Sequence, residues 1–358
     1  MNPTHYLKST WLTLLLVLTF IVSWEAYWRH NHYVLAYNDD ESLWAYTRQQ
    51  IYQSSPARPV LIGSSRIKFD LDLATWQRIT GEKPIQLSLV GTSPRPVLTD
   101  LGNDPNFKGT LLIDVTEPLF FTPTGAFPEK EAANRVAAYP NWSLSQQASF
   151  QINRVLEANF LFLDALNLSL NPILNQLPIP ERPGTWGGPK FPYEFAVNGL
   201  DRQTRMTDAM VADTAIQNKV KRMWLEIGAH SPRGAIAGPP LLDILKATKR
   251  SVDQIRARGG QVLFIRTPSD GPMYQAEKQM FPRTQYWDRL LSYTQAPGIY
   301  FSDYPALTRF TCPEWSHLTP KDAERFTQAL IPIIAQKTGW SLQRNLSASS
   351  SKSSSSSF

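Results

Sequence analysis

The sequence predicts an α/β domain with a parallel β-sheet, which follows a single N-terminal transmembrane helix and contains a large insertion. Two observations support this fold class. A long uncharged apolar run lies near the N-terminus, and short apolar runs alternate with helix-like segments after residue 58. With 358 residues, of which 42% are hydrophobic, the chain can bury one large core or two smaller ones.

The segment Ser9–Trp24, "STWLTLLLVLTFIVSW", contains no charged residue. It is short for a full span, which needs about 20 residues. Trp11, Trp24 and Trp28 can extend it as anchors at the membrane interface. No cleavage site with small residues follows. The pattern therefore predicts an uncleaved signal anchor over 1–28, with a cleaved signal peptide and a buried core helix as the alternatives.

Residues 29–57 form a predicted linker helix that Asp39 or Asp40 caps. An α/β domain over 58–340 follows. Strand, helix, strand, helix, strand at this spacing predicts βαβ units, whose right-handed crossovers bring the carboxyl ends of the strands to one edge. The segments are the strands "PVLIG" (59–63), "PIQLSLVG" (84–91) and "GTLLIDV" (109–115), with the helices "LDLATWQRITG" and "RPVLTDLGN" between them.

An insertion at about 118–218 is rich in proline, asparagine and aromatic residues, and we expect it to cover or extend the site. Its clearest loop is "RPGTWGGPKFPYE" at 182–194. The α/β pattern then resumes with a helix at 241–260, strands at "QVLFIRTP" (261–268) and 298–305, and an amphipathic closing helix at 321–339. The tail over 341–358 is almost all serine from residue 347, which predicts disorder.

Charge and cysteine content exclude several classes of protein. The net charge is +6 and the pI about 9.3, but the basic residues are scattered and form no stripe with interleaved aromatics. Nucleic-acid binding is therefore not predicted. The single cysteine, Cys312, excludes an internal disulfide framework and a cysteine-rich zinc site. The sequence indicates no metal and no cofactor.

Ser65 follows the first predicted strand, and a serine needs a neighbouring base to act as a nucleophile. His317 is the candidate base, because it lies between the last strand and the closing helix, at the same edge of the sheet. His230 lies in a loop beyond the insertion. The other three histidines flank the membrane segment: His5, His30 and His32. Glu314, three residues before His317, can orient the imidazole, and Asp303 at a strand end is the alternative acid.

The chain resembles the SGNH (GDSL-type) hydrolase superfamily over about 60–116 and 260–335. Three motifs carry the resemblance: Gly63-Ser64-Ser65, Gly91 in "SLVGTS", and Glu314-Trp315-Ser316-His317. The resemblance implies a three-layer, flavodoxin-like fold with Ser65 as nucleophile and His317 as base. It also implies that the backbone N–H groups of Gly91 and Ser65 bind the oxyanion. The Gly-Ser-Ser variant is similar to the D-alanine transfer proteins that modify teichoic acids.

The family's third motif, which supplies an asparagine after the third strand, is missing from "IDVTEPLF". Thr116 and Arg266 are the candidate replacements, and Arg66 is a further candidate for binding an anionic or glycan group. A literal Gly102-Asn103-Asp104 precedes the third strand. It is therefore expected at the opposite edge, as a turn.

The resemblance implies a single-pass protein of the inner membrane, with its large domain in the periplasm or otherwise outside the cytoplasm. The predicted activity is that of a serine esterase or O-acyltransferase on acyl esters of envelope or secreted polysaccharide. The expected partners are the membrane, a glycan and a multi-pass membrane acyltransferase. Two alternatives are a catalytically idle glycan-binding or assembly protein and a regulator on the cytoplasmic side. At residue level, Ser64-Ser65 can instead be a helix cap and His317 a structural donor.

Overall fold

The structure, a computed structural model, describes residues 3–53, 58–164, 168, 170–175, 188, 191–231 and 234–342. Its body is an α/β fold around a five-stranded parallel sheet with the strand order β2-β1-β3-β6-β7. The strands are β1 (Val60–Ile62), β2 (Ile85–Gln86), β3 (Thr110–Asp114), β6 (Gln261–Arg266) and β7 (Gly298–Tyr300). Each lies within a segment predicted as a strand, so the predicted parallel sheet is confirmed.

The register shows how the short apolar runs form this sheet. Val60 of β1 pairs with Ile85 on one side and with Leu111 on the other, and β3 pairs with β6 over its whole length. Strands of a parallel sheet are covered on both faces, which is why these runs are apolar without alternation. The strand order reverses between β1 and β3, and open α/β sheets bind ligands at the carboxyl ends of strands at such a reversal.

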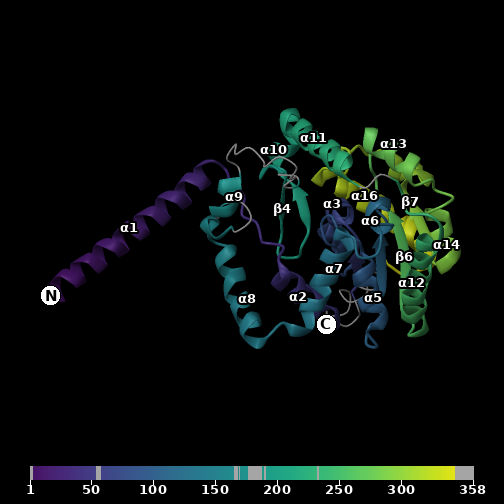
Figure 1. The fold of residues 1–358 in the computed structure, drawn as a ribbon, viewed down its shortest axis with the longest axis horizontal. Helices are drawn as coiled ribbons and strands as arrows, with labels where there is room; N and C mark the ends of the chain where they lie inside the picture. Colours follow the sequence, from purple (N-terminus) through teal and green to yellow (C-terminus); the bar gives the residue numbers. More distant parts are fainter. Residues whose placement is uncertain are drawn as a thin grey trace, which may run out of the picture.

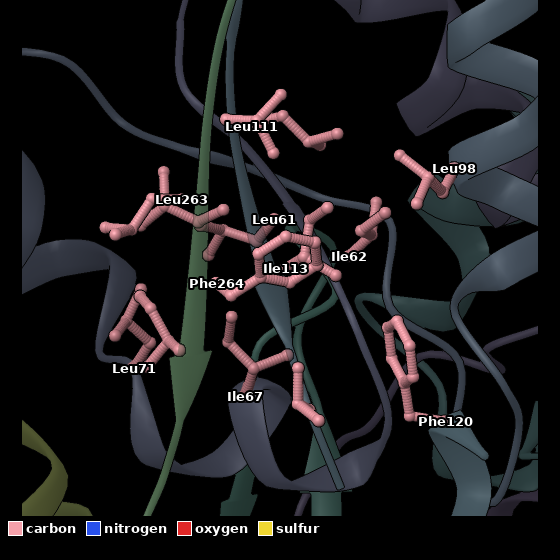
Figure 2. Close-up of a cluster of buried hydrophobic side chains, with 14 of the residues drawn as sticks. Leu61, Ile62, Ile67, Leu71, Leu98, Leu111, Ile113, Phe120, Leu263 and Phe264 are labelled. Carbon is pink, nitrogen blue, oxygen red and sulfur yellow. The ribbon is translucent and has the colours of Figure 1, made fainter. Parts of the chain in front are cut away.

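Two groups of helices pack beside the sheet. One group consists of α3 (Ser65–Asp70), α4 (Leu73–Thr80) and the closing helix α16 (Pro320–Thr338). The other consists of α5 (Arg95–Asn103), α12 (Gly238–Ala257) and α14 (Trp287–Thr294). Right-handed crossovers between parallel strands produce two such groups, one on each face, when the strand order reverses. Figure 2 shows part of the core, where side chains of β1, β3 and β6 meet those of α3 and α5.

Helix α1 (Pro3–His30) extends away from the body (Figure 1) and contains a segment, Tyr6–His30, that is long and apolar enough to cross a membrane. The predicted linker helix over 29–57 is wrong in part. The chain leaves the helix after His30 and becomes helical again in α2 (Glu41–Gln49) and η1 (Gln50–Tyr52). The Asp40 carboxylate accepts a hydrogen bond from Leu43 N and so caps the start of α2, because the first N–H groups of a helix lack backbone partners.

The insertion contains regular elements, mostly helices, and contributes a separate small sheet. Its longer helices are α7 (Phe127–Ala138) and α8 (Leu144–Glu157), and β4 (Ala196–Asn198) pairs antiparallel with β5 (Thr204–Met206). Helix α11 (Thr214–His230) begins at the end of the insertion and continues past it. Shorter elements are α6 (Glu117–Phe120), η2 (Tyr139–Asn141), η3 (Leu161–Leu163), α9 (Leu170–Asn175) and α10 (Asp208–Ala212). After the insertion come α13 (Gly271–Met280), η4 (Phe301–Asp303) and α15 (Pro305–Thr308). Most of the predicted loop at 182–194 and of the serine-rich tail lies outside the described residues.

Candidate active site

Ser65 lies where β1 ends and α3 begins, at the carboxyl edge of the sheet. Gly63 permits this turn, because a Cβ at this position would lie only 2.6 Å from Asp114 Cβ and 2.8 Å from Ile67 Cγ2. Only glycine lets the first strand pass this close to the third before it enters α3. The residue pattern Gly-Ser-Ser therefore has a structural cause at its first position.

The structure brings Ser65, His317 and Glu314 together in one hydrogen-bonded chain. Ser65 Oγ lies 2.8 Å from His317 Nε2, and His317 Nδ1 lies 2.8 Å from Glu314 Oε1. This is the order that a serine nucleophile needs: a base beside the hydroxyl, and an acid that holds the far side of the imidazole. His317 and Glu314 are buried, whereas Ser65 is half-buried.

Glu314 is fixed by donors on both carboxylate oxygens. Oε1 accepts a hydrogen bond from the backbone N of His317 at 2.7 Å in addition to the imidazole contact, and Oε2 accepts from the indole N–H of Trp224. Trp315, between the acid and the base, has a φ of 78°, which bulky residues rarely adopt. Asp270 N donates to the carbonyl oxygen of Trp315 at 2.8 Å, so the unusual turn is held from outside.

Aromatic side chains cover the imidazole of His317. The ring centroid of Phe69 lies 4.2 Å from that of His317, and those of Phe195 and Trp224 lie 5.9 and 6.0 Å away. Phe69 belongs to α3, but Trp224 comes from α11 and Phe195 immediately precedes β4. The insertion was expected to cover or extend the site, and its residue Phe195 does contact the region around the imidazole of His317.

Gly91 lies at the carboxyl edge of the sheet, because the chain after β2 continues along the end of β1. Leu87 N donates to Leu61 O at 2.8 Å, and Leu89 N donates to Gly63 O at 3.2 Å. The chain then turns at Val90 and Gly91, at the same edge of the sheet at which β1 ends and α3 begins. Gly91 is exposed and has a φ of 68°, and no atom lies within 4 Å of the position its Cβ would take.

Two backbone donors are available at this opening. Within the part of the chain that the structure describes, neither the N–H of Gly91 nor that of Ser65 donates to a backbone or side-chain acceptor. Unpaired N–H groups next to a nucleophile are what binds the oxyanion of an acyl-transfer intermediate.

Thr116 occupies a different position from the one an oxyanion donor needs. Its hydroxyl donates to Asp114 Oδ2 at 2.9 Å and lies 2.7 Å from Ser64 Oγ, inside a buried cluster below the site. The prediction that Thr116 replaces the missing asparagine does not fit this engagement. Ser64 occupies the N-cap position of α3, yet its side chain caps no helix N–H and contacts Thr116 and Asp114 instead.

Arg66 and Arg266 are buried, so neither fits the predicted role of a substrate-binding group at an open site. Both pair with Glu277 of α13, and Arg266 also pairs with Glu117 at 3.2 Å. Arg66 Nε additionally lies 3.4 Å from Ser316 Oγ, next to the base. Of the three guanidinium nitrogens of Arg66, Nη1 has no partner among the described residues, and this atom is buried too.

These charges strongly affect one another. Burial works to raise the pKa of Glu277, but the guanidinium groups of Arg66 and Arg266 outweigh it and hold the pKa below its ordinary value. Burial raises the pKa of Glu117 and of Asp114, against the lowering effect of the same two arginines. We call Arg66, Arg266, Glu117 and Glu277 the ionic cluster. It connects α3, α6, β6 and α13, and Arg66 directly follows Ser65 in α3.

Several predicted or alternative site residues lie elsewhere. Asp303 pairs with Arg283 on the surface and does not contact His317, so Glu314 is the acid at the base. His230 ends α11 and is exposed. The predicted turn at Gly102-Asn103-Asp104 is wrong in part: Gly102 and Asn103 end α5, and Asp104 follows as its C-cap and pairs with Arg48, before β3 begins. Burial raises the pKa of the Cys312 thiol well above its ordinary value, which keeps it protonated and a poor nucleophile.

Sequence reasoning missed Trp224, Phe195 and the ionic cluster. Phe69 carried a weak signal, because it lies four residues after Ser65 on the same helix and so shares a face with it. Trp224 and Phe195 carried none, since they reach the site only through the fold of the insertion. No group of three or more His, Cys, Asp or Glu side chains within the described ranges is placed to hold a metal ion.

No family model matches this chain, and no curated protein is significantly similar to it.

Proposed function

We propose that the protein is a membrane-anchored serine esterase or O-acyltransferase that works outside the cytoplasm on acyl esters of envelope or secreted polysaccharide. One observation carries the catalytic part of this proposal. Ser65 Oγ lies 2.8 Å from His317 Nε2, and the other imidazole nitrogen lies 2.8 Å from the buried Glu314 carboxylate. The resemblance of the motifs around Gly63, Gly91 and His317 to SGNH hydrolases supports an ester substrate and a polysaccharide context.

In the proposed reaction, Ser65 Oγ attacks the carbonyl carbon of an acyl ester while His317 Nε2 takes the hydroxyl proton. Glu314 accepts a hydrogen bond from Nδ1–H and stabilises the imidazolium. The N–H groups of Ser65 and Gly91 bind the negative oxygen of the tetrahedral intermediate. His317 then gives the proton to the departing alcohol oxygen, which leaves Ser65 acylated. Water or a sugar hydroxyl, deprotonated by His317, attacks the acyl-enzyme and restores Ser65.

The anchoring part of the proposal is supported by how α1 meets the body. The Glu25 carboxylate accepts hydrogen bonds from Leu161 N and Phe162 N, each at 3.1 Å, and Arg29 Nη2 donates to Asn159 O at 2.7 Å. A cleaved signal peptide has no need of contacts with the mature domain. These contacts favour a helix that stays attached as a membrane anchor.

The test is labelling of the full-length protein in detergent with a fluorophosphonate probe, followed by peptide mass spectrometry. We expect an adduct on Ser65 in the wild type, and no adduct in Ser65→Ala or His317→Ala. Ser64→Ala is the matched control, because it removes the neighbouring hydroxyl, which contacts Thr116 rather than the base. An unlabelled but folded wild type, or an adduct that persists in His317→Ala at the same rate, would refute the proposed mechanism.

A second candidate function is glycan binding without catalysis. The observation that favours it is the hydrogen bond from the Thr116 hydroxyl to Asp114, which engages the side chain that was expected to replace the family's asparagine. Isothermal titration with soluble fragments of acylated and deacylated polysaccharide separates the two functions. Binding of both fragments without turnover and without Ser65 labelling would favour this second function.

A further inference from the structure

Helix α8 of the insertion turns its apolar side toward solvent. We define the apolar face of α8 as Leu144, Ile152, Val155 and Leu156, together with Phe160 just beyond the helix end. All five are exposed, from 38% for Leu156 to 83% for Leu144. Within the helix, the spacing of three, four and eight residues puts Leu144, Ile152, Val155 and Leu156 on one side. Contiguous exposed apolar surface of this kind marks a contact with a partner or with a membrane.

The inward side of the same helix is partly polar, which reverses the usual arrangement of a surface helix. Arg154 Nη1 donates to Tyr46 OH at 3.0 Å, and Glu157 Oε1 accepts from Asn38 Nδ2 at 3.3 Å. Phe150 is the buried apolar residue of the helix. A helix that directs charged side chains inward and aliphatic ones outward is suited to an apolar medium outside.

The C-terminal part of α1, around Glu25, indicates that the apolar medium is a membrane. Glu25 follows directly after the uncharged run Ser9–Trp24, so it marks the depth at which a membrane-spanning helix reaches the headgroups. Its carboxylate binds the backbone of Leu161 and Phe162, which come immediately after Phe160. The end of α8 is thereby fixed at this depth.

Aromatic side chains surround the same level. Trp28 packs edge-on against Trp24 and Tyr33, and Tyr33 stacks on Tyr193, with ring centroids 5.4 to 5.8 Å apart. Tryptophan and tyrosine are enriched at the membrane–water interface. Figure 1 shows α8 and α9 on the side of the body from which α1 emerges, with α12 on the other side.

We propose that the apolar face of α8 lies in the headgroup region of the same bilayer that α1 crosses. Leu170 and Leu174 of α9, both exposed, extend this contact. The domain then has two attachments, a spanning helix and an interfacial helix, and the second prevents rotation about the first. An amphipathic helix in the plane of the interface binds through its buried apolar area. A bilayer is favoured over a second copy of the chain because the face is continuous with the root of the anchor.

This inference rests on the proposed anchoring by α1, and the test separates the two. The full-length protein, with Cys312→Ser as background, is placed as a single copy in lipid nanodiscs. An environment-sensitive fluorophore is attached to one introduced cysteine at a time: Ile152→Cys on the apolar face, Leu16→Cys within α1, or Lys246→Cys on α12. Lipids carry a spin-label quencher either near the headgroup or near the chain end. Circular dichroism checks that each variant is folded, and Leu156→Cys replaces Ile152→Cys if that variant is not.

We expect a blue-shifted emission at position 152 that the shallow quencher reduces most, strongest quenching by the deep probe at position 16, and neither effect at position 246. Emission at position 152 that matches position 246, while position 16 is lipid-buried, would overturn the inference and leave the anchor intact. If position 16 is also in water, both the anchor and the inference fail. A blue shift at position 152 that requires two copies per disc would assign the face to self-association and overturn the membrane contact.

Discussion

The two sides of the Ser65–His317 pair are built in opposite ways. On the side of Ser65, the ionic cluster of Arg66, Arg266, Glu117 and Glu277 is fully buried and holds its charges in close pairs. Around His317, the contacts are the rings of Phe69, Phe195 and Trp224, and one indole N–H reaches Glu314. His317 is thus held in an aromatic environment, whereas fixed charges lie next to Ser65 in the chain.

The origin of the two sides differs as well. The ionic cluster connects elements of the α/β body and one short helix at the start of the insertion. The aromatic side depends on Trp224 and Phe195, which come from the far end of the insertion and the helix after it. The difference teaches that the charges near Ser65 come mainly from the body, whereas two of the three rings around His317 come from the far end of the insertion and from α11. Substitutions on the two sides should therefore affect different properties.

Removing one charge from the ionic cluster should have the largest effect on stability. Arg266→Met leaves Glu117 and Glu277 with one guanidinium fewer, and breaking a buried ion pair from one side costs about 3–5 kcal/mol. We expect that loss in the free energy of unfolding, measured by urea denaturation of the detergent-solubilised protein. An unchanged stability together with weaker substrate binding would restore the substrate-binding role that the sequence predicted for Arg266.

On the aromatic side, Trp224→Phe removes one hydrogen bond to the Glu314 carboxylate while keeping a ring next to His317. Hydrogen bonds to charged groups are worth about 1.5–3 kcal/mol. We expect a loss of that size in stability and a roughly tenfold slower labelling of Ser65, since about 1.4 kcal/mol in the barrier is tenfold in rate. Trp142→Phe is the matched control, because its indole N–H has no partner among the described residues. Equal labelling rates in the two variants would contradict a positioning role for Trp224.

The buried carboxyl of Asp70, which forms no ion pair with a described residue, should make the stability of the protein depend on pH. Burial raises the pKa of Asp70 well above its ordinary value, and Asp114 nearby raises it further, although Leu318 N donates to its Oδ1. The native state therefore holds this proton more tightly than the unfolded state does. As pH rises from the ordinary aspartate range toward the raised pKa, the unfolded state ionises first and stability is lost.

Asp70→Asn keeps an acceptor for Leu318 N and removes the titration. We expect the variant to become more stable than the wild type as pH rises, by up to about 1.4 kcal/mol per pH unit within that window. Urea unfolding at a series of pH values measures the difference. A stability difference that stays constant with pH would show that Asp70 does not titrate between the two states.

The smallest effect on stability is expected from a surface ion pair that belongs neither to the ionic cluster nor to the aromatic side. Arg283 pairs with Asp303 and Asp288 on the surface, where the side chains are about two-fifths exposed. Exposed pairs contribute about 0–1 kcal/mol, so Arg283→Met should change the free energy of unfolding by no more than that, and less in high salt. A loss as large as that of Arg266→Met would remove the contrast between buried and exposed arginines.

The sequence predicted the parallel sheet because the apolar runs of β1, β3 and β6 have no alternation and are bounded by glycine or proline. It also placed Ser65 and His317 at one edge, because strand order and crossover handedness leave few choices. The sequence did not predict that Arg66 and Arg266 are buried. A basic residue at or just after the end of a strand gives the same sequence pattern whether its side chain faces solvent or a buried glutamate. The partner of Arg266, Glu277, is local, but Glu117 is far away in sequence. The sequence did not predict the contact of Trp224 with Glu314 either, because the two residues are far apart in sequence.

The contacts of Glu25 and Arg29 with residues 159–162 attach the end of α1 directly to the body, so α1 is not joined to it through a flexible linker alone. The segment that follows is held as well, because Tyr37 N donates to Asn198 O and Asp39 pairs with Arg202. With α1 in a membrane, as proposed, Ser65 works at one fixed height above the lipid. Acyl groups on polymer that has diffused away lie beyond its reach. If Ser65 acts on a polysaccharide, as proposed, a chain that emerges at the membrane surface passes at that height, and its modification would be coupled in time to export.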